Sequence, residues 1–487
     1  MSLKRRDILG GLAALLPAQA LAVDGALRPK LRQNTTLRAP SARVALDPRL
    51  ANLTGFALRD LSTGRILEEH QPRLSLPPAS VTKAVTALYA IDALGLGYRF
   101  PTDVAVTGRI TGGTLEGDLY LIGGGDPTLD SDRLAHLARA VAAAGIRQVR
   151  GRTYAVGTTL PYFRNIDPGQ PEHVGYNPAI SGLNLNFNRV HFRWTRRGTG
   201  YDTELVAAGQ KHMPAVAGID IALANRKAPV FQFRDADGRD SWSVAAGALG
   251  ARGARWLPVR QPTLYAAEVF RTLASAAGVA MPAFTEARIA PEDGRLARVE
   301  SSDCARLLRT MLKYSTNLTA EVVGLRASQA RGQVPNSLVA SGEEMTRWLR
   351  NRYGLSKARF VNHSGLSDQT RMTVEEMVQL LDIAAATTPL QSLMRAHPLS
   401  RAEGTKTPLP GVEIRAKTGT LYFTRTLAGY IEGRGRRLAF AIFAADLNAR
   451  AGFRANSAKI PNGSGGWRAA ALKQERALLR HFANVHL

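Results

Sequence analysis

The sequence predicts an α+β protein whose main domain is interrupted by a β-rich region. Three observations support this class. A strand hairpin leads into a helix near residue 80. Short β-like segments with glycine turns fill the middle of the chain. Helical periodicity returns near residue 302 and is followed by two apolar strands and a final helix. With 487 residues, the chain is long enough for about two or three domains.

The composition excludes several classes of protein. Hydrophobic residues make up 45% of the chain and charged residues 21%, as in globular proteins. The single cysteine, Cys304, excludes an intramolecular disulfide and a cysteine metal cluster. The nine histidines contain no His-Glu-x-x-His pattern, so a zinc hydrolase is unsupported.

The formal net charge of +25 is large, and it favours polyanions or anionic membrane faces as partners. The basic residues are spread along the chain, and we recognise no nucleic-acid-binding module among them, so we expect no nucleic-acid partner. A carboxylate-rich polymer fits the charge equally well. Simple solubility is the alternative explanation.

The N-terminus has the pattern of an export signal. Residues 1–22 combine the twin-arginine pattern Lys4-Arg5-Arg6-Asp7-Ile8-Leu9, a short apolar stretch and the small-residue site Ala20-Leu21-Ala22. An ordinary basic signal for the general export route is the alternative. Either route takes the protein out of the cytoplasm, with cleavage near Ala22. Residues 23–43 are polar and basic, which predicts a flexible lead-in, and no later stretch is apolar enough to span a membrane.

The first structured elements are a hairpin and a helix. Segments 53–58 and 65–67 flank turn residues, which predicts two paired strands. A helix then follows from Val81, and Gly95 is suited to end it. Ser80 is therefore expected at the helix start, where free N–H groups and the helix dipole favour negative charge. Lys83 follows one turn later on the same face, within reach of the Ser80 hydroxyl.

The pair Ser80 and Lys83 has the arrangement of a nucleophile beside its base. The pattern is weak alone, since a chain of this composition contains on the order of one Ser-x-x-Lys by chance. The alternative is a helix-capping serine followed by a solvated lysine.

The sequence predicts that residues 105–295 form an inserted β-rich region, with 200–250 as a separate small lobe. A helix is expected at 131–145 and a strand pair around 184–195. The glycine triplet 123–125 is not followed by Gly-Lys-Ser/Thr, which favours a turn over a phosphate-binding loop.

Helices return in the last third of the chain. Ser302 is suited to cap the first, which runs into Ser315-Thr316-Asn317. Further helices are expected from about 318, at 340–353 and at 373–386. The stretch 415–420 then leads into two strands joined by a glycine-arginine turn, and a C-terminal helix ends the chain. The expected strands are 425–432 and 437–446.

Three short motifs gain weight from their order. Ser-x-x-Lys at 80–83, Ser-x-Asn at 315–317 and Lys-Thr-Gly at 417–419 each occur once. The chain thereby resembles the penicillin-binding proteins and serine β-lactamases, whose motifs these are. The interval of about 235 residues between the first two motifs, and the β-rich region within it, are similar to the class C low-molecular-mass penicillin-binding proteins of the DacB type. The segments 117–127, 175–178 and 362–367 also look like that branch, although Asn362-His363 and Thr316 depart from its usual pattern.

The resemblance implies a fold and a reaction. The fold would be a serine β-lactamase/transpeptidase-like domain, with an antiparallel sheet and helices on both faces, built from 44–105 plus 295–487. The reaction would be hydrolysis of D-Ala-D-Ala ends and of peptidoglycan cross-links, in the periplasm, without cofactor or metal. β-Lactams would be covalent inhibitors. The sequence leaves open the oligomeric state and whether the N-terminal segment keeps the protein at the membrane.

The resemblance also implies a role for each motif residue. Ser80 would attack the peptide carbonyl, Lys83 would take its proton when neutral, and Ser315 would pass a proton to the departing amine. Asn317 would bind the substrate amide and orient Lys83. The base is disputed in such enzymes, and Lys83 is favoured here. The oxyanion would lie between backbone N–H groups of residues 80 and 420. The terminal carboxylate would be held by the strand residues Lys417, Thr418, Gly419 and Thr420.

Other residues carry less specific signals. Arg371 could contact the stem peptide, with a surface salt bridge as the alternative. Asp126 and Asp446 are expected to stabilise turns. His363 is expected to be structural, and Cys304 to pack in the core without a redox function.

Two other functions share parts of this pattern. A β-lactamase has all three motifs, but it needs a deacylation device such as Glu-x-x-Leu-Asn between the first two, and we find none. A non-catalytic wall-binding protein could retain the fold, but the intact motif residues argue against it.

Overall fold

The computed structural model describes residues 46–236, 238–405, 407–452 and 460–487. The expected export signal at 1–22 and the lead-in at 23–43 lie outside the described residues. Within the described ranges, we find no helix that is both long and apolar enough to cross a bilayer.

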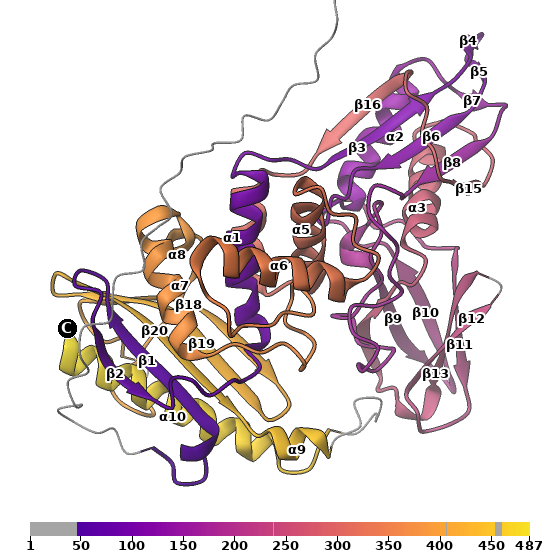
Figure 1. The fold of residues 1–487 in the computed structure, drawn as a ribbon. Helices are drawn as coiled ribbons and strands as arrows, with labels where there is room; N and C mark the ends of the chain where they lie inside the picture. Colours follow the sequence, from indigo (N-terminus) through magenta and orange to yellow (C-terminus); the bar gives the residue numbers. More distant parts are fainter. Residues whose placement is uncertain (1–45, 237, 406, 453–459) are drawn as a thin grey trace, which may run out of the picture.

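A six-stranded antiparallel sheet, with strand order β17-β18-β19-β20-β1-β2, forms the base of the main domain (Figure 1). The strands are β1 (Thr54–Asp60), β2 (Ile66–His70), β17 (Arg395–Ala396), β18 (Val412–Leu421), β19 (Thr424–Gly433) and β20 (Arg436–Ala445). The predicted N-terminal hairpin and the predicted pair of C-terminal strands are therefore confirmed. Because β1 pairs with β20 along its whole length, the sheet joins the two ends of the chain.

Both faces of this sheet are covered by helices, as expected (Figure 1). In β20, Phe440 and Ile442 pack toward the C-terminal helix α10 (Ser464–His486), whereas Ala441 and Phe443 pack into the helical core of the other face. This alternation follows from the two-residue period of a strand. The helices of that other face are α1 (Thr82–Leu94), α4 (Cys304–Tyr314), α5 (Asn317–Ala330), α6 (Leu338–Tyr353), α7 (Val374–Thr387) and α8 (Leu390–Leu393).

A second body has its own core and its own sheets. Its largest sheet has the order β15-β8-β6-β3-β16, and the chain enters and leaves through β3 and β16, which pair antiparallel. This sheet consists of β3 (Pro101–Val106), β6 (Leu119–Gly123), β8 (Thr153–Val156), β15 (Phe284–Ala287) and β16 (Arg295–Glu300), and it packs with α2 (Ser131–Ala143) and α3 (Pro262–Ala276). The smaller sheets comprise β4 (Arg109–Thr111), β5 (Thr114–Glu116) and β7 (Gln148–Val149); β9 (Arg189–Arg197), β10 (Gly200–Val206) and β14 (Arg252–Pro258); and β11 (Ile219–Ala224), β12 (Phe231–Ala236) and β13 (Arg239–Ala245).

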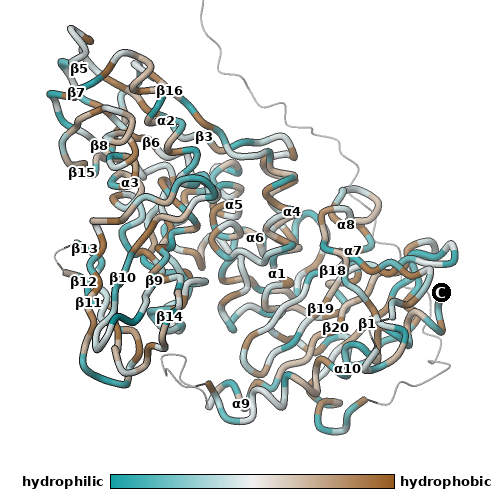
Figure 2. The backbone as a smooth tube through the Cα atoms, turned by 180° about the vertical axis from the view of Figure 1, so that it is seen from behind, coloured by the Kyte–Doolittle hydropathy of each residue, from teal (hydrophilic) through white to brown (hydrophobic). Residues whose placement is uncertain are grey.

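The second body lies beside the helical layer of the main domain, next to α5 (Figures 1 and 2). It lies far from β2, an edge strand of the six-stranded sheet. A hydrogen bond of 2.9 Å from Gln329 Nε2, on α5, to the carbonyl oxygen of Thr159 joins the two bodies. The surface of the main domain that the second body contacts therefore includes the helix that begins with Asn317.

The structure corrects three local expectations. Asp303, not Ser302, caps α4, because its side chain directly precedes the helix and accepts from Arg306 N at 2.8 Å. The strand pair expected around 184–195 begins only at β9, because residues 186–188 form a turn with positive φ angles. Helix α3 was not expected, although Pro262 in its first turn is a typical start signal.

We expect the ion pair between α10 and β19 to stabilise the main domain. Arg425 and Glu475 bond through two contacts of 2.7 Å, and their side chains are only 15% and 2% exposed. Glu475→Ala should lower the free energy of unfolding by about 3–5 kcal/mol, because it leaves a largely buried guanidinium without its carboxylate partner. Chemical denaturation of the full chain measures this loss.

The same sheet offers a matched control. Arg415 and Glu413 also pair at 2.6 Å, but their side chains are 36% and 54% exposed. Glu413→Ala should therefore cost about 1 kcal/mol or less. Equal losses in the two variants would contradict the importance that we assign to burial.

Candidate active site

Ser80 lies in a short 3₁₀ turn, Ala79–Val81, that runs directly into α1. The preceding residue, Ala79, has a φ of 46°, a region that non-glycine residues rarely adopt. The turn is held from the sheet, since Thr426 Oγ1 donates a 2.8 Å hydrogen bond to the carbonyl oxygen of Pro78. The surrounding packing thus maintains a strained backbone beside Ser80, as is common at functional sites.

The Lys83 amine is the centre of the site. Its Nζ lies 3.0 Å from Ser80 Oγ, 2.8 Å from Asn317 Oδ1 and 2.7 Å from the carbonyl oxygen of Ser364. The last two oxygens can only accept hydrogen bonds. A neutral amine would use its two N–H bonds for them, which leaves its lone pair for the Ser80 hydroxyl. The geometry is therefore that of a base directed at a nucleophile.

The electrostatics favour this neutral form. Lys83 is fully buried. Burial, and then the positive charge of Lys417, lower the pKa of Lys83 well below its usual range, while Glu321 opposes the shift. A lysine of this kind can accept a proton near neutral pH.

A second lysine and a second serine lie on the other side of the site. Lys417 Nζ donates to Ser315 Oγ at 3.0 Å and to the carbonyl oxygen of Thr418 at 2.7 Å. Ser315 itself is the residue that ends α4, and its backbone is left-handed, with a φ of 58°. Burial, with the nearby charges of Arg425 and Arg395, lowers the pKa of Lys417 to about 7. When protonated, Lys417 has the charge to bind a carboxylate, and its hydrogen bond to Ser315 Oγ is a path for a proton.

Asn317, the first residue of α5, joins the two bodies of the protein. Its Oδ1 accepts from Lys83, and its Nδ2 donates to the carbonyl oxygen of Tyr176 at 2.9 Å. Tyr176 belongs to a loop that is fixed by its neighbour Asn177, whose carbonyl oxygen accepts from the buried Arg260 at 2.7 Å. The second body therefore supplies a backbone contact to the site.

Strand β18 forms the floor beside Ser80. It pairs with β17 only at residues 415 and 416, so Lys417 to Thr420 extend beyond that partner. A Cβ on Gly419 would lie 2.2 Å from Thr426 Oγ1 and 2.9 Å from the backbone N of Ser80, so only glycine lets the strand approach this closely. Thr420 is exposed, and its Oγ1 accepts from Arg425 at 3.1 Å. The open strand edge is suited to an extended peptide.

Glu321 is a further residue of the site that the sequence analysis missed. It is fully buried, and its carboxylate accepts from Ser364 N at 2.8 Å and from His363 N at 3.0 Å. It thereby holds the loop whose Ser364 carbonyl contacts Lys83. Burial raises the pKa of Glu321, and its hydrogen bonds oppose that shift. The sequence signal that could have identified Glu321 is its position one helical turn after Asn317.

Among the described residues, none of the remaining candidates has a hydrogen bond to the Ser80 hydroxyl. Arg371 donates to the carbonyl oxygens of Thr370 and Asp368, and among the described residues it has no ion pair or hydrogen bond with the motif side chains. The expected surface salt bridge of Arg371 is likewise not found among them. His363 is buried against Ser341, and burial lowers its pKa to about 3. Asp126 accepts from Thr128 N in its own turn as expected, and Cys304 is buried. Asp446 instead caps the short helix α9 (Leu447–Ala451), where its side chain accepts from Ala449 N.

Comparisons with known proteins found a family model and relatives to which the chain is similar. The family model of the D-Ala-D-Ala carboxypeptidase 3 (S13) family matches residues 37–460. A D-alanyl-D-alanine carboxypeptidase of an Actinomadura species is 28% identical over 469 residues, which cover 88% of this chain and 84% of the relative.

Solved structures show the same fold. Penicillin binding protein 4 (dacB) of Haemophilus influenzae superposes with a TM-score of 0.68 at 19% identity, covering 88% of this chain and 96% of that one. A second structure of that protein, complexed with a β-lactam, gives a TM-score of 0.69 with the same identity and coverage. The expected α+β fold is confirmed.

We expect Glu321→Gln to slow the reaction of Ser80. An amide can accept only one of the two backbone N–H bonds and opposes the other with its own N–H group. Loss of a hydrogen bond to a charged group costs about 1.5–3 kcal/mol, or about 10- to 150-fold in rate if the Ser364 carbonyl is displaced. The rate at which labelled penicillin modifies the variant measures the effect.

Glu376 provides a control for this prediction. It is also a buried carboxylate, and it accepts from Lys357 N at 2.7 Å, but it has no contact with Lys83. Glu376→Gln should destabilise the protein without slowing the labelling of its folded fraction. A similar loss of rate in both variants would show that Glu321 acts only through stability.

Proposed function

The chain belongs to the D-Ala-D-Ala carboxypeptidase 3 (S13) family, and on that premise we propose that it hydrolyses D-Ala-D-Ala bonds of peptidoglycan stem peptides through an ester on Ser80. The observation that carries the proposal is the position of the buried Lys83 amine, 3.0 Å from Ser80 Oγ and held by two carbonyl acceptors. The family resemblance inferred from the three motifs is confirmed.

Acylation begins when Ser80 Oγ attacks the carbonyl carbon of the penultimate D-Ala and its proton passes to Lys83. The negative charge of the tetrahedral intermediate lies near the backbone N–H groups of Ser80 and Thr420, whose strand packs against the start of α1. Ser315 gives a proton to the departing amine, and Lys417 restores it through their 3.0 Å contact. The peptide bond breaks and D-Ala leaves, so that the stem remains as an ester on Ser80.

Deacylation repeats these steps with water as the nucleophile. Before this step Lys83 releases the Ser80 proton to solvent and Lys417 takes one up, so both lysines return to their starting states. Lys83 then takes a proton from the attacking water, the ester bond breaks, and Lys83 gives that proton to Ser80 Oγ. Lys417, Thr418, Gly419 and Thr420 hold the terminal carboxylate of the substrate before the first step. The described side chains supply each proton transfer, so the proposal includes no cofactor.

Cleavage of cross-links is part of the same proposal. In a cross-link the departing amine belongs to a second stem and not to a free D-Ala, but the bond and the proton transfers are identical. The exposed position of Thr420 and the free edge of β18 leave room for the larger leaving group.

A β-lactamase is the less favoured function. Rapid hydrolysis of a drug ester needs a carboxylate that activates water. Glu321 lies near Lys83, but its oxygens accept from the backbone of the 363–364 loop. We therefore propose that β-lactams acylate Ser80 and are released slowly.

The proposal extends to location and organisation. An export signal at residues 1–22 would deliver the protein to the periplasm, where peptidoglycan is found, and peripheral membrane association remains compatible with the net charge of +25. We also propose that 44–105 plus 295–487 and 105–295 are distinct domains. The separate apolar cores and the pairing of β3 with β16 support this division.

The decisive experiment is digestion of purified peptidoglycan fragments with products measured by mass spectrometry. A monomeric pentapeptide should lose one alanine, and a cross-linked dimer should be split. Ser80→Ala should abolish both reactions and the labelling by penicillin without loss of folding. Retained labelling in this variant would refute the assignment of Ser80.

The two lysines predict a bell-shaped pH dependence of kcat/KM. Activity should rise as pH increases through the lowered pKa of Lys83, because only the neutral amine is a base. It should fall above the Lys417 pKa of about 7, because Lys417 then loses the charge that attracts the substrate carboxylate. Steady-state rates with a D-Ala-D-Ala peptide test this, and a value of kcat/KM that keeps rising to pH 9 would contradict the role of Lys417.

A further inference from the structure

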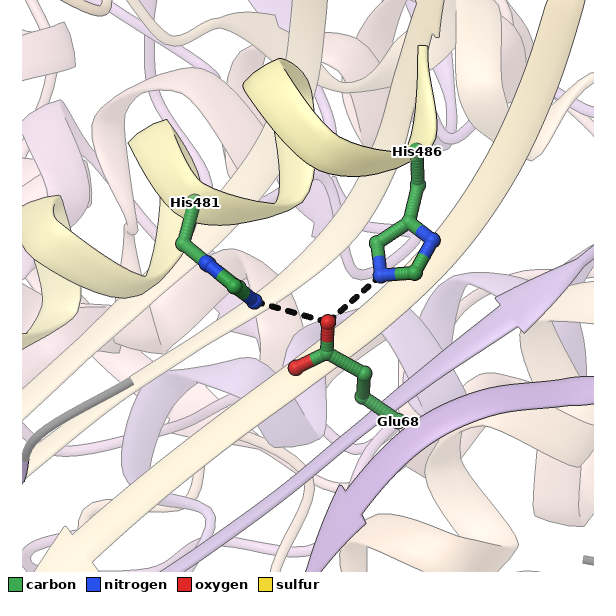
Figure 3. A group of neighbouring side chains, drawn as sticks. All are labelled: Glu68, His481 and His486. Carbon is green, nitrogen blue, oxygen red and sulfur yellow. Dashed lines mark hydrogen bonds and ion pairs between the residues drawn. The ribbon is translucent and has the colours of Figure 1, made fainter. Parts of the chain in front are cut away.

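Three polar side chains meet at the β2 edge of the six-stranded sheet, the edge opposite β17 (Figure 3). Glu68 comes from the edge strand β2, and His481 and His486 come from the last turns of α10. Figure 3 shows both imidazole rings directed at one carboxylate oxygen. None of these residues contributes to the site around Ser80.

The ligand atoms of the three side chains already converge. His481 Nε2 lies 2.7 Å and His486 Nε2 lies 2.5 Å from Glu68 Oε1. The candidate ligand atoms all lie within 4.8 Å of one another. The Glu68 side chain is 4% exposed, and the two histidines are 14% and 13% exposed, so the cluster is enclosed but reachable from solvent.

The choice of partners is unusual for this chain. Two other buried carboxylates pair with arginine, Asp126 with Arg133 and Glu475 with Arg425, and two more, Glu321 and Glu376, accept from backbone N–H groups. Among the described residues, the partners of Glu68 are the two imidazoles alone. Both rings direct Nε2 at one carboxylate oxygen, so three atoms of the kinds that ligate metal ions lie together.

The donor set matches zinc. Two histidine nitrogens and one carboxylate oxygen, with water as fourth ligand, form a common tetrahedral zinc environment. Bonds of about 2.0–2.1 Å in a tetrahedron separate the ligand atoms by about 3.3 Å. Glu68 Oε1 would need to separate from each Nε2 by less than about 1 Å. The two Nε2 atoms, which lie within 4.8 Å of one another, would need to reach the same spacing.

The backbone that carries these residues is well fixed. Glu68 is the one buried residue of β2. On α10, Leu478, Leu479 and Phe482 lie in the core between the helix and the sheet, and Leu487 packs against the same core. A rigid frame that holds three ligands in place lowers the entropic cost of binding an ion.

We propose that Glu68, His481 and His486 form a binding site for a divalent transition-metal ion, with zinc as the preferred ion. The ion would link the last turns of α10 to β2, the strand from which the chain continues to Ser80. Its role is to stabilise the main domain, because an ion that binds only the folded state shifts the unfolding equilibrium.

Zinc titration of the metal-free full chain tests the proposal by isothermal calorimetry. We expect one ion per chain, with a dissociation constant of about 1 μM or lower, and a higher melting temperature in zinc. His481→Gln and His486→Gln should each weaken binding by at least about 10-fold and reduce the gain in melting temperature. Cobalt should bind with the visible spectrum of a four-coordinate ion.

His212 provides the matched control, because its Nδ1 lies 2.9 Å from Asp132 Oδ1 without a second imidazole. His212→Gln should bind zinc as tightly as the unmodified chain. The His486→Gln variant changes a residue in the last turn of α10, so circular dichroism without metal should show its fold unchanged. Absence of zinc binding, or an affinity in either histidine variant equal to that of the unmodified chain, would overturn the proposal.

Discussion

The burial of the Lys83 amine is the constraint on which the active-site architecture depends. A lysine with no exposed surface must have polar partners, and it has Ser80 Oγ, Asn317 Oδ1 and the Ser364 carbonyl. These partners come from the start of α1, the start of α5 and a separate loop. The fold must therefore bring α5 and this loop, both distant in sequence from α1, within hydrogen-bond distance of Lys83 Nζ. The same burial lowers the pKa of Lys83 and so favours the neutral amine that the proposed mechanism needs.

The main sheet provides the frame for this convergence. Strands from both ends of the chain complete it, and its two faces bury separate cores. Thr426, on β19, bonds the turn before Ser80, while Gly419, on β18, lets the sheet approach the nucleophile. Arg425, also on β19, connects these strands to α10 through its ion pair with Glu475. Stability and catalytic geometry thus depend on neighbouring residues of the same two strands.

Local patterns in the sequence were sufficient for the hairpin, most helices and the three motifs, because strand alternation, helical spacing and each short motif involve neighbouring residues. Contacts between distant segments were not predictable in this way. Glu321 belongs to no motif, and the resemblance of segment 175–178 did not predict the contact of the Tyr176 carbonyl. The roles of both depend on how α5 meets a loop and the second body. Glu68 and His481, which are 413 positions apart, meet only because the C-terminal helix crosses the edge strand.

The contact between Asn317 Nδ2 and the Tyr176 carbonyl has a consequence for how this architecture can change. The amide that orients Lys83 is itself oriented by a backbone atom of the second body. Removing that body would leave an unsatisfied donor within the catalytic cluster. The second body is therefore not an interchangeable module, and recombination between relatives would have to exchange the loop and α5 together to preserve the register of the site.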